Sequence, residues 1–323
     1  MIHFVGAGSG APDLITVRGK KYLEEADVVI YAGSLVNPKL LEYTKDICTI
    51  YNSAKMTLEE VLSVMEKAEA AGKTTVRLHT GDPCIYGAIR EQMDVLDEKG
   101  IAYDYCPGVS AFCGAASALN LEYTLPDISQ SVIITRMEGR TPVPPKESIQ
   151  SFAAHQATMV VFLSTGMLEE LSRRLIEGGY TADTPAAIVY KATWEDEKKF
   201  VCTVGTLAQT AKENHITKTA LMIIGDCVNA AHYDRSKLYD PGFTTEFREL
   251  VFFGMDGFVT GPTLAVLFVT VWQIFIAEFG ANAPVSPAAS AIPGVIPVRP
   301  QPDSSVPTEA KKSKAPRKSR GQR

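Results

Sequence analysis

The chain contains 323 residues, of which 46% are hydrophobic and 21% are charged, and its formal net charge is −5. This ordinary globular composition excludes a collagen-like, coiled-coil or wholly disordered protein. Residues 301–323 hold seven Lys or Arg against Asp303 and Glu309, a local charge of +5, so the first 300 residues carry −10. We expect no nucleic-acid partner for so acidic a body, because phosphate binding needs concentrated positive charge.

Short apolar runs alternate with amphipathic stretches in the first part of the chain. We predict strands over residues 2–5, 28–31, 75–79 and 103–105, and helices over 16–26, 38–43, 58–71 and 88–99. Thr57 is a suitable N-cap for the third helix, with Glu60 as its capping-box partner. Strand–helix–strand order predicts a mainly parallel sheet with helices on its faces.

A second set of elements begins near residue 131. We predict strands over residues 131–135, 159–163, 186–190, 199–203 and 220–225, and helices over 168–177 and 206–213. The proline-rich stretch 139–145 is a predicted loop, because proline fixes φ and lacks an N–H donor. The pattern therefore predicts an N-terminal α/β lobe over residues 1–120 and a C-terminal α/β lobe over 121–248, with mainly parallel or mixed sheets.

The chain changes character after residue 248. We assign residues 249–278 to an apolar segment and residues 279–323 to a disordered tail that is first Pro/Ala-rich and then basic. Residues 258–277 carry no formal charge and are long enough to span a bilayer. A spanning helix would, however, put the basic tail on the far side of the membrane, against the positive-inside tendency. Membrane contact through 258–277, a helix packed on the body or a partner, and a foreign segment all stay open.

The six cysteines form no CxxC pair and no Cys/His cluster with zinc spacing. We expect no metal site and reduced, mostly buried thiols. The first residues run directly into a glycine loop without a secretory signal. We therefore expect a cytoplasmic protein.

The first motif is the glycine loop after the first strand, where Gly6, Gly8 and Gly10 leave room for a ligand to approach the backbone. A dinucleotide-binding loop would have a third glycine at position 11 and an acidic residue at the end of the second strand. Position 11 is Ala, and residues 32–34 after that strand are Ala-Gly-Ser. The sequence therefore disfavours NAD.

Two further strands end in turns that expose backbone amides. His79-Thr80-Gly81-Asp82-Pro83 follows one strand, and Pro107-Gly108-Val109-Ser110-Ala111 follows the other. Ligands bind at the carboxyl edge of open α/β sheets, where such turns lie. The alternative for the first turn is a purely structural Asp-Pro turn.

Together, in this order and spacing, the three motifs resemble the tetrapyrrole (corrin/porphyrin) methyltransferase family. The first loop matches the family pattern V-G-x-G-P-G-x-P-x-L-[IL]-T, except that Ser9 stands in place of the usual proline and loosens the loop slightly. Gly81-Asp82-Pro83 with Tyr86-Gly87, followed by residues 107–111, matches the second family signature. The resemblance covers about residues 1–245.

The resemblance implies two lobes that enclose a cleft for S-adenosyl-L-methionine, which leaves as S-adenosyl-L-homocysteine. The stretches at residues 31–36, 135–144 and 238–241 resemble those of family members that methylate precorrin-4 or cobalt-precorrin-4 at C11 in cobalamin biosynthesis. The family resemblance also implies a homodimer. Carried over by position, the expected cofactor contacts are Pro12, Gly81, Asp82, Ile85, Tyr86, Ser110, Ala111, Leu163, Ser164, Ala192, Thr219, Ala220 and Leu221.

The implied substrate is a macrocycle fringed with carboxylates. Arg136 and Arg140 on the proline loop, with Arg18, are therefore candidates for bidentate contacts, and solvated surface arginines are the alternative. His79 is a candidate substrate contact or a hydrogen-bonded histidine at a strand end. Asp82 is the candidate catalytic residue, more by positioning a ligand than by moving a proton.

A sulfonium methyl donor needs no metal, and holding the reacting atoms in line is the main task of the protein. Two other functions stay open from the sequence. One is methylation of another corrin or porphyrin carbon, of a modified histidine on a protein, or of ribosomal RNA, as related enzymes do. The other is a membrane-tethered tetrapyrrole-binding protein without activity.

Overall fold

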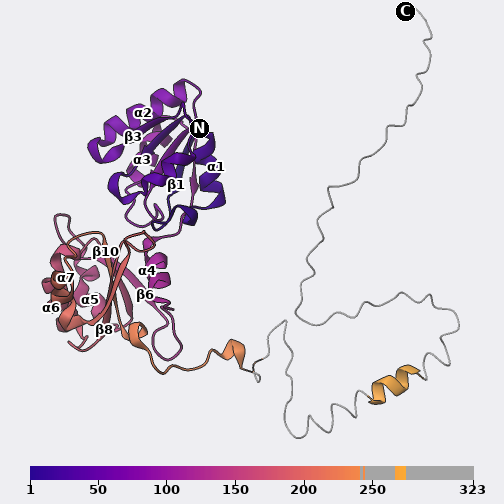
Figure 1. The fold of residues 1–323 in the computed structure, drawn as a ribbon, viewed down its shortest axis with the longest axis vertical. Helices are drawn as coiled ribbons and strands as arrows, with labels where there is room; N and C mark the ends of the chain where they lie inside the picture. The colour runs from indigo at the N-terminus through magenta and orange to yellow at the C-terminus, as the bar shows by residue number, and fades with distance from the viewer. Residues whose placement is uncertain (241–242, 244–265, 274–323) are drawn as a thin grey trace, which may run out of the picture. The chain divides into compact units, whose positions relative to one another are not determined.

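The computed structural model describes residues 1–240, Phe243 and residues 266–273 (Figure 1). The chain divides into two compact units, Met1–Glu249 and Leu250–Arg323. In the second unit the described residues form a helix over 266–273. No helix among the described residues is both long and apolar enough to cross a membrane. The rest of the predicted apolar segment and tail lies outside the described residues.

The first unit contains two five-stranded sheets, and the first of them is entirely parallel. Its strand order is β3-β2-β4-β1-β5. The strands are β1 (Ile2–Gly6), β2 (Val28–Tyr31), β3 (Thr49–Asn52), β4 (Thr75–His79) and β5 (Tyr103–Cys106). Its helices are α1 (Val17–Glu25), α2 (Leu58–Ala70) and α3 (Arg90–Glu98). The predicted parallel sheet is confirmed.

The second sheet is mixed, with the order β6-β7-β10-β8-β9. β6 and β7 are parallel, and the other neighbours are antiparallel. The strands are β6 (Val132–Arg136), β7 (Thr158–Phe162), β8 (Pro185–Tyr190), β9 (Lys198–Thr203) and β10 (Ala220–Ile224). The helices after β5 are α4 (Ala111–Leu119), α5 (Ile149–Ala153), α6 (Leu168–Gly178) and α7 (Leu207–Glu213).

Each sheet buries apolar side chains on both faces, as expected when helices cover both. On the second sheet, α5, α6 and α7 cover one face and α4 covers the other (Figure 1). Ala115 and Ala118 of α4 pack with Val160 and Val189 of this sheet. The predicted lobe boundary at residues 120/121 stays a prediction, although the helix before it contributes to the core of the second sheet.

Candidate active site

The glycine-containing motifs meet at the carboxyl ends of the neighbouring strands β4, β1 and β5. Gly8 and Gly81 exchange two backbone hydrogen bonds, with N···O distances of 3.2 and 2.9 Å. A Cβ on Gly6 would lie 2.6 Å from the Cα of Gly108, and one on Gly108 would lie 2.2 Å from the carbonyl oxygen of Gly81. Glycine is therefore required here because the three loops touch through their backbones.

Asp82 fixes the turn after β4 with both of its carboxylate oxygens. Oδ1 accepts hydrogen bonds from the Tyr105 hydroxyl and from the Cys84 amide, at 2.9 Å for the amide. Oδ2 accepts from the Gly108 amide at 3.0 Å. Burial would raise the pKa of this carboxyl, but the hydrogen bonds from Tyr105, Cys84 and Gly108 outweigh burial and hold the pKa below its usual value. Asp82 is therefore an ionised acceptor that ties two of the motifs together.

A cavity of about 190 Å³ lies beside these loops, and most of its wall is apolar. It takes residues from the first sheet's loops and from the ends of β7, β8 and β10. Six predicted cofactor residues line it, namely Ala111, Leu163, Ala192, Thr219, Ala220 and Leu221. The remaining lining residues are Ser9, Leu35, Thr80, Phe162, Thr165, Val189, Lys191 and Trp194. An apolar cleft with few polar groups is typical of a small-molecule site.

Three non-glycine residues of this wall have a left-handed backbone. The φ angles are 52° at Leu163, 47° at Lys191 and 58° at Thr219. Such conformations cost of order 1–3 kcal/mol each and persist only where the surrounding structure enforces them. Leu163 also exposes 65% of its surface although it is apolar. Strained residues and an exposed leucine together mark this cavity as the candidate ligand site.

The other predicted cofactor residues do not line the cavity: Pro12, Gly81, Asp82, Ile85, Tyr86, Ser110 and Ser164. Ser164 is fully buried, donates to the Phe162 carbonyl at 2.6 Å and accepts from the Met137 amide at 2.8 Å. Its side chain therefore joins the ends of β6 and β7, and its contact with the cofactor stays a prediction. Tyr86 lies next to the cavity wall, because its ring centroid is 5.6 Å from that of Phe162, which lines the cavity.

Some of the lining residues that we did not predict stand within the sequence motifs, and others do not. Leu35 and Thr80 stand within the stretches that carried the family resemblance, and the Thr80 hydroxyl donates to the Leu35 carbonyl at 2.6 Å. Lys191 and Trp194 belong to the β8–β9 loop (residues 191–197), which has no glycine motif. This loop reaches the cavity through tertiary packing, so no local pattern indicated it.

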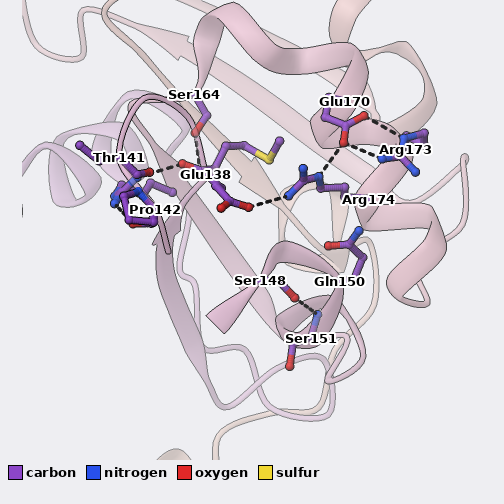
Figure 2. A network of polar contacts seen from close by, with 12 residues as sticks. Glu138, Thr141, Pro142, Ser148, Gln150, Ser151, Ser164, Glu170, Arg173 and Arg174 are labelled. Carbon is purple, nitrogen blue, oxygen red and sulfur yellow. Dashed lines mark hydrogen bonds and ion pairs between the residues drawn. The ribbon is translucent and has the colours of Figure 1, made fainter. Parts of the chain in front are cut away.

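The proline loop after β6 (residues 137–147) is organised by Arg136. Its guanidinium donates to the carbonyls of Met137 at 3.1 Å, Thr141 at 3.3 Å and Pro142 at 2.8 Å. Glu138 faces Arg174 of α6 at 3.9 Å, and Arg174 donates to Glu170 at 2.7 Å (Figure 2). Arg136 therefore shapes the loop through its backbone.

The other two predicted substrate arginines are exposed. Arg140 lies within the proline loop, and Arg18 lies in the first turn of α1. Neither guanidinium has a hydrogen bond or ion pair with another described residue, so both keep their donors for a ligand.

His79 is 4% exposed at the end of β4, and its Nε2 has no hydrogen-bond partner among the described residues. Burial and the nearby Arg77 lower the pKa of His79 to about 3, so the ring is neutral at physiological pH. His79 is almost fully buried, and its contact with the substrate stays a prediction. No group of three His, Cys, Asp or Glu side chains in the described residues could hold a metal ion.

The sequence model described as Tetrapyrrole (Corrin/Porphyrin) Methylases matches residues 1–208. This chain belongs to that family. It is 55% identical over 248 residues to a cobalt-precorrin-4 C(11)-methyltransferase of Methanocaldococcus jannaschii, covering 77% of this chain and 96% of the relative. It is 42% identical over 248 residues to a precorrin-4 C(11)-methyltransferase of Sinorhizobium sp, covering 76% of this chain and 98% of the relative.

The fold of a solved member of the family agrees with this one. The X-ray structure of a cobalt precorrin-4 methyltransferase, a cobalamin biosynthetic enzyme, superposes with a TM-score of 0.69 at 43% identity. The superposition covers 71% of this chain and 95% of the chain in that structure. The predicted family, fold class and methylase activity are therefore confirmed.

Proposed function

We propose that this chain transfers the methyl group of S-adenosyl-L-methionine to C11 of precorrin-4 or cobalt-precorrin-4. The observation that carries the proposal is the match of 55% identity over 96% of a relative that bears this activity in its name. The convergence of the three glycine loops beside one apolar cavity supports it, because the family motifs are assembled into a site.

The cavity suits the methyl donor chemically. Its apolar wall can cover an adenine ring and the methylene chain of the methionine part. Ala111, Ala192 and Leu221 would form part of the binding wall. When bound, the donor supplies an electrophilic methyl on a sulfonium, so this chain need not provide an acid or a metal.

The main task of the protein residues is then to hold the reactants in line and to exclude water. Well-oriented reactions gain up to about 7–11 kcal/mol from positioning. Asp82 contributes by holding the turn after β4 against Tyr105 and Gly108. Because both of its oxygens already accept hydrogen bonds, we assign Asp82 to positioning the site rather than to proton transfer.

The carboxylate-fringed macrocycle would meet Arg140 on the proline loop and Arg18 on α1. Both guanidiniums are exposed and have no partner among the described residues. An arginine fork fits a carboxylate in bidentate geometry. We assign Arg136 to holding the loop that presents Arg140, because its donors serve three loop carbonyls.

We also propose that the enzyme is a homodimer, as the family resemblance implies, and that it acts in the cytoplasm. Methylation of another corrin or porphyrin carbon remains the alternative within the family. A membrane-tethered binding protein is disfavoured because the glycine loops are intact. The apolar side chains exposed on the helix over residues 266–273 keep membrane contact as a separate prediction.

The proposal is tested by incubating the purified chain with methyl-labelled S-adenosyl-L-methionine and either precorrin-4 or cobalt-precorrin-4. Mass spectrometry and NMR then locate the new methyl group. We expect label at C11. Label at another ring carbon would favour the alternative within the family, and donor binding without any transfer would favour the binding protein. Uroporphyrinogen III serves as a control substrate that should remain unlabelled.

A further inference from the structure

The β8–β9 loop (residues 191–197) is hydrogen-bonded to the glycine loop after β1. The Thr193 hydroxyl oxygen lies 3.0 Å from the Ser9 hydroxyl oxygen and accepts a hydrogen bond from the Ala11 amide at 3.1 Å. A Cβ on Gly10 would lie 2.1 Å from the Trp194 ring, so the two loops are in direct contact. Ser9 is thus held in place by the β8–β9 loop.

A count of hydrogens at this pair leaves one donor unused. Two hydroxyls carry two hydrogens, and the bond between Ser9 and Thr193 uses one of them. The Ala11 amide occupies a lone pair of Thr193 and supplies no acceptor. Among the described residues, neither hydroxyl has a further acceptor. One O–H of the pair is therefore available to a ligand.

The place of Ser9 identifies where that ligand would lie. Ser9 is 7% exposed, and it lines the cavity together with Ala192 and Trp194. Its Oγ would lie 2.7 Å from a Cβ on Gly114 of α4, so the helix closes its other side. The cavity is the open space beside the hydroxyl. The family pattern has proline at this position, which has no side-chain donor.

We propose that Ser9 is a binding residue whose hydroxyl donates a hydrogen bond to an oxygen of the methyl donor. The inference rests on the proposed function, since it takes S-adenosyl-L-methionine as the occupant of the cavity. Two oxygens of that molecule share the required acceptor chemistry, the carboxylate of the methionine part and a ribose hydroxyl. Thr193 orients Ser9 without touching the ligand.

Calorimetry with two ligands distinguishes these acceptors in the full chain. S-adenosyl-L-homocysteine carries both the carboxylate and the ribose, whereas 5′-methylthioadenosine carries only the ribose. If Ser9 donates to the carboxylate, Ser9→Ala weakens binding of the first ligand by about tenfold or more and leaves the second unchanged. If Ser9 donates to the ribose, both ligands lose about three- to tenfold.

Two further variants separate binding from a merely structural role. Ser172→Ala removes a hydroxyl that donates to the Val204 carbonyl, away from the cavity, and should leave both affinities unchanged. Thr193→Val breaks the hydroxyl pair but keeps Ser9, so it should weaken the homocysteine ligand less than Ser9→Ala does.

Equal affinity of Ser9→Ala and wild type for both ligands would overturn the assignment. So would an equal loss in Ser9→Ala and Thr193→Val, because it would make Ser9 only a loop contact. If wild type itself bound neither ligand, the proposed function would fail first. The two failures are thus distinguishable.

Discussion

His79 and Asp82 lie three residues apart at the end of β4, yet their surroundings favour opposite charge states. His79 is buried beside Arg77 with an unpartnered Nε2, which lowers its pKa to about 3 and keeps it neutral. Asp82 receives hydrogen bonds from Tyr105, Cys84 and Gly108, which favour the charged form. These environments, which the sequence does not display, set the charge state of each side chain.

Asp82→Asn tests whether this carboxylate positions the turn or moves a proton. The amide can accept at one atom only, so at least one of the donors from Tyr105, Cys84 and Gly108 loses its partner. We expect weaker S-adenosyl-L-homocysteine binding together with a loss of stability of about 1–3 kcal/mol. Calorimetry and urea unfolding measure the two effects.

Tyr105→Phe is the matched variant, because it removes one donor to Asp82 and leaves the carboxylate. We expect a smaller loss of the same kind, about 0.5–1.5 kcal/mol. Unchanged cofactor binding in Asp82→Asn with a large fall in kcat would instead assign proton transfer to Asp82.

The lowered pKa of His79 predicts that the free energy of unfolding depends on pH. The unfolded histidine binds a proton below its ordinary pKa of about 6.5, whereas the folded one does so only near 3. The unfolded state therefore binds more protons between these values, and stability falls as the pH decreases. From pH 7 to 5 this group should remove about 2 kcal/mol.

Urea unfolding of wild type and His79→Phe at pH 7 and pH 5 checks this expectation. The variant keeps a ring near Phe4 but cannot titrate, so its loss between the two pH values should be smaller. His155→Gln removes an exposed histidine and should behave like wild type. An identical pH dependence in His79→Phe and wild type would show that His79 does not remain neutral on folding.

At the scale of elements, one arginine fixes the shape of the proline loop after β6 through hydrogen bonds to its backbone. Prolines leave the loop with few backbone donors, and the Arg136 guanidinium gathers three of its carbonyls. Glu138 meets Arg174 of α6 at its base. The loop therefore has a defined shape that presents Arg140 to solvent.

Arg136 and Arg140 should accordingly respond differently to lysine. Arg140→Ala should raise the KM for the tetrapyrrole by about tenfold, and Arg140→Lys should recover part of the loss because a charge remains. Arg136→Lys should raise the KM for the tetrapyrrole as much as Arg136→Ala does, because an ammonium lacks the planar fork that serves separate carbonyls. The affinity for S-adenosyl-L-homocysteine should stay unchanged in all four. A parallel loss of that affinity would place the loop at the cofactor instead.

Local sequence patterns predicted most helices and strands, because the residues that start and end these elements lie close together in the sequence. The capping box of Thr57 and Glu60 is present at the start of α2, with both hydrogen bonds formed. The edge strand β3 was missed, since its four residues are half-exposed and show no alternation. The stretch Pro38–Tyr43 is a 3₁₀ helix, where periodicity alone had indicated an ordinary helix.

The site was predictable to the extent that it is built from motifs. The turns that carry Gly6, Gly81 and Gly108 meet as expected, because parallel neighbouring strands end at one edge. Lys191 and Trp194 could not be predicted, since they reach the cavity only through the packing of the β8–β9 loop. The burial of Ser164 was equally hidden, because it depends on how β6 and β7 pair.

At the scale of the whole molecule, the unit Met1–Glu249 and the extension after it differ in composition. The unit Met1–Glu249 holds both sheets and every residue that lines the cavity. The alignment with the Methanocaldococcus jannaschii relative spans 248 residues and 96% of that relative, which leaves the rest of this chain outside it. The chemistry is therefore expected to reside in the first unit alone.

A chain that ends at Glu249 should fold and keep its activity. Its affinity for S-adenosyl-L-homocysteine and its kcat/KM should lie within about twofold of the full chain, a difference of less than about 0.5 kcal/mol. Calorimetry, turnover and thermal unfolding check this. A chain that ends at residue 278 is the matched variant, because it keeps the uncharged run 258–277 and lacks the basic end. Loss of cofactor binding in the shorter chain and not in the longer one would show that residues 250–278 complete the site, because the apolar segment is what separates the two.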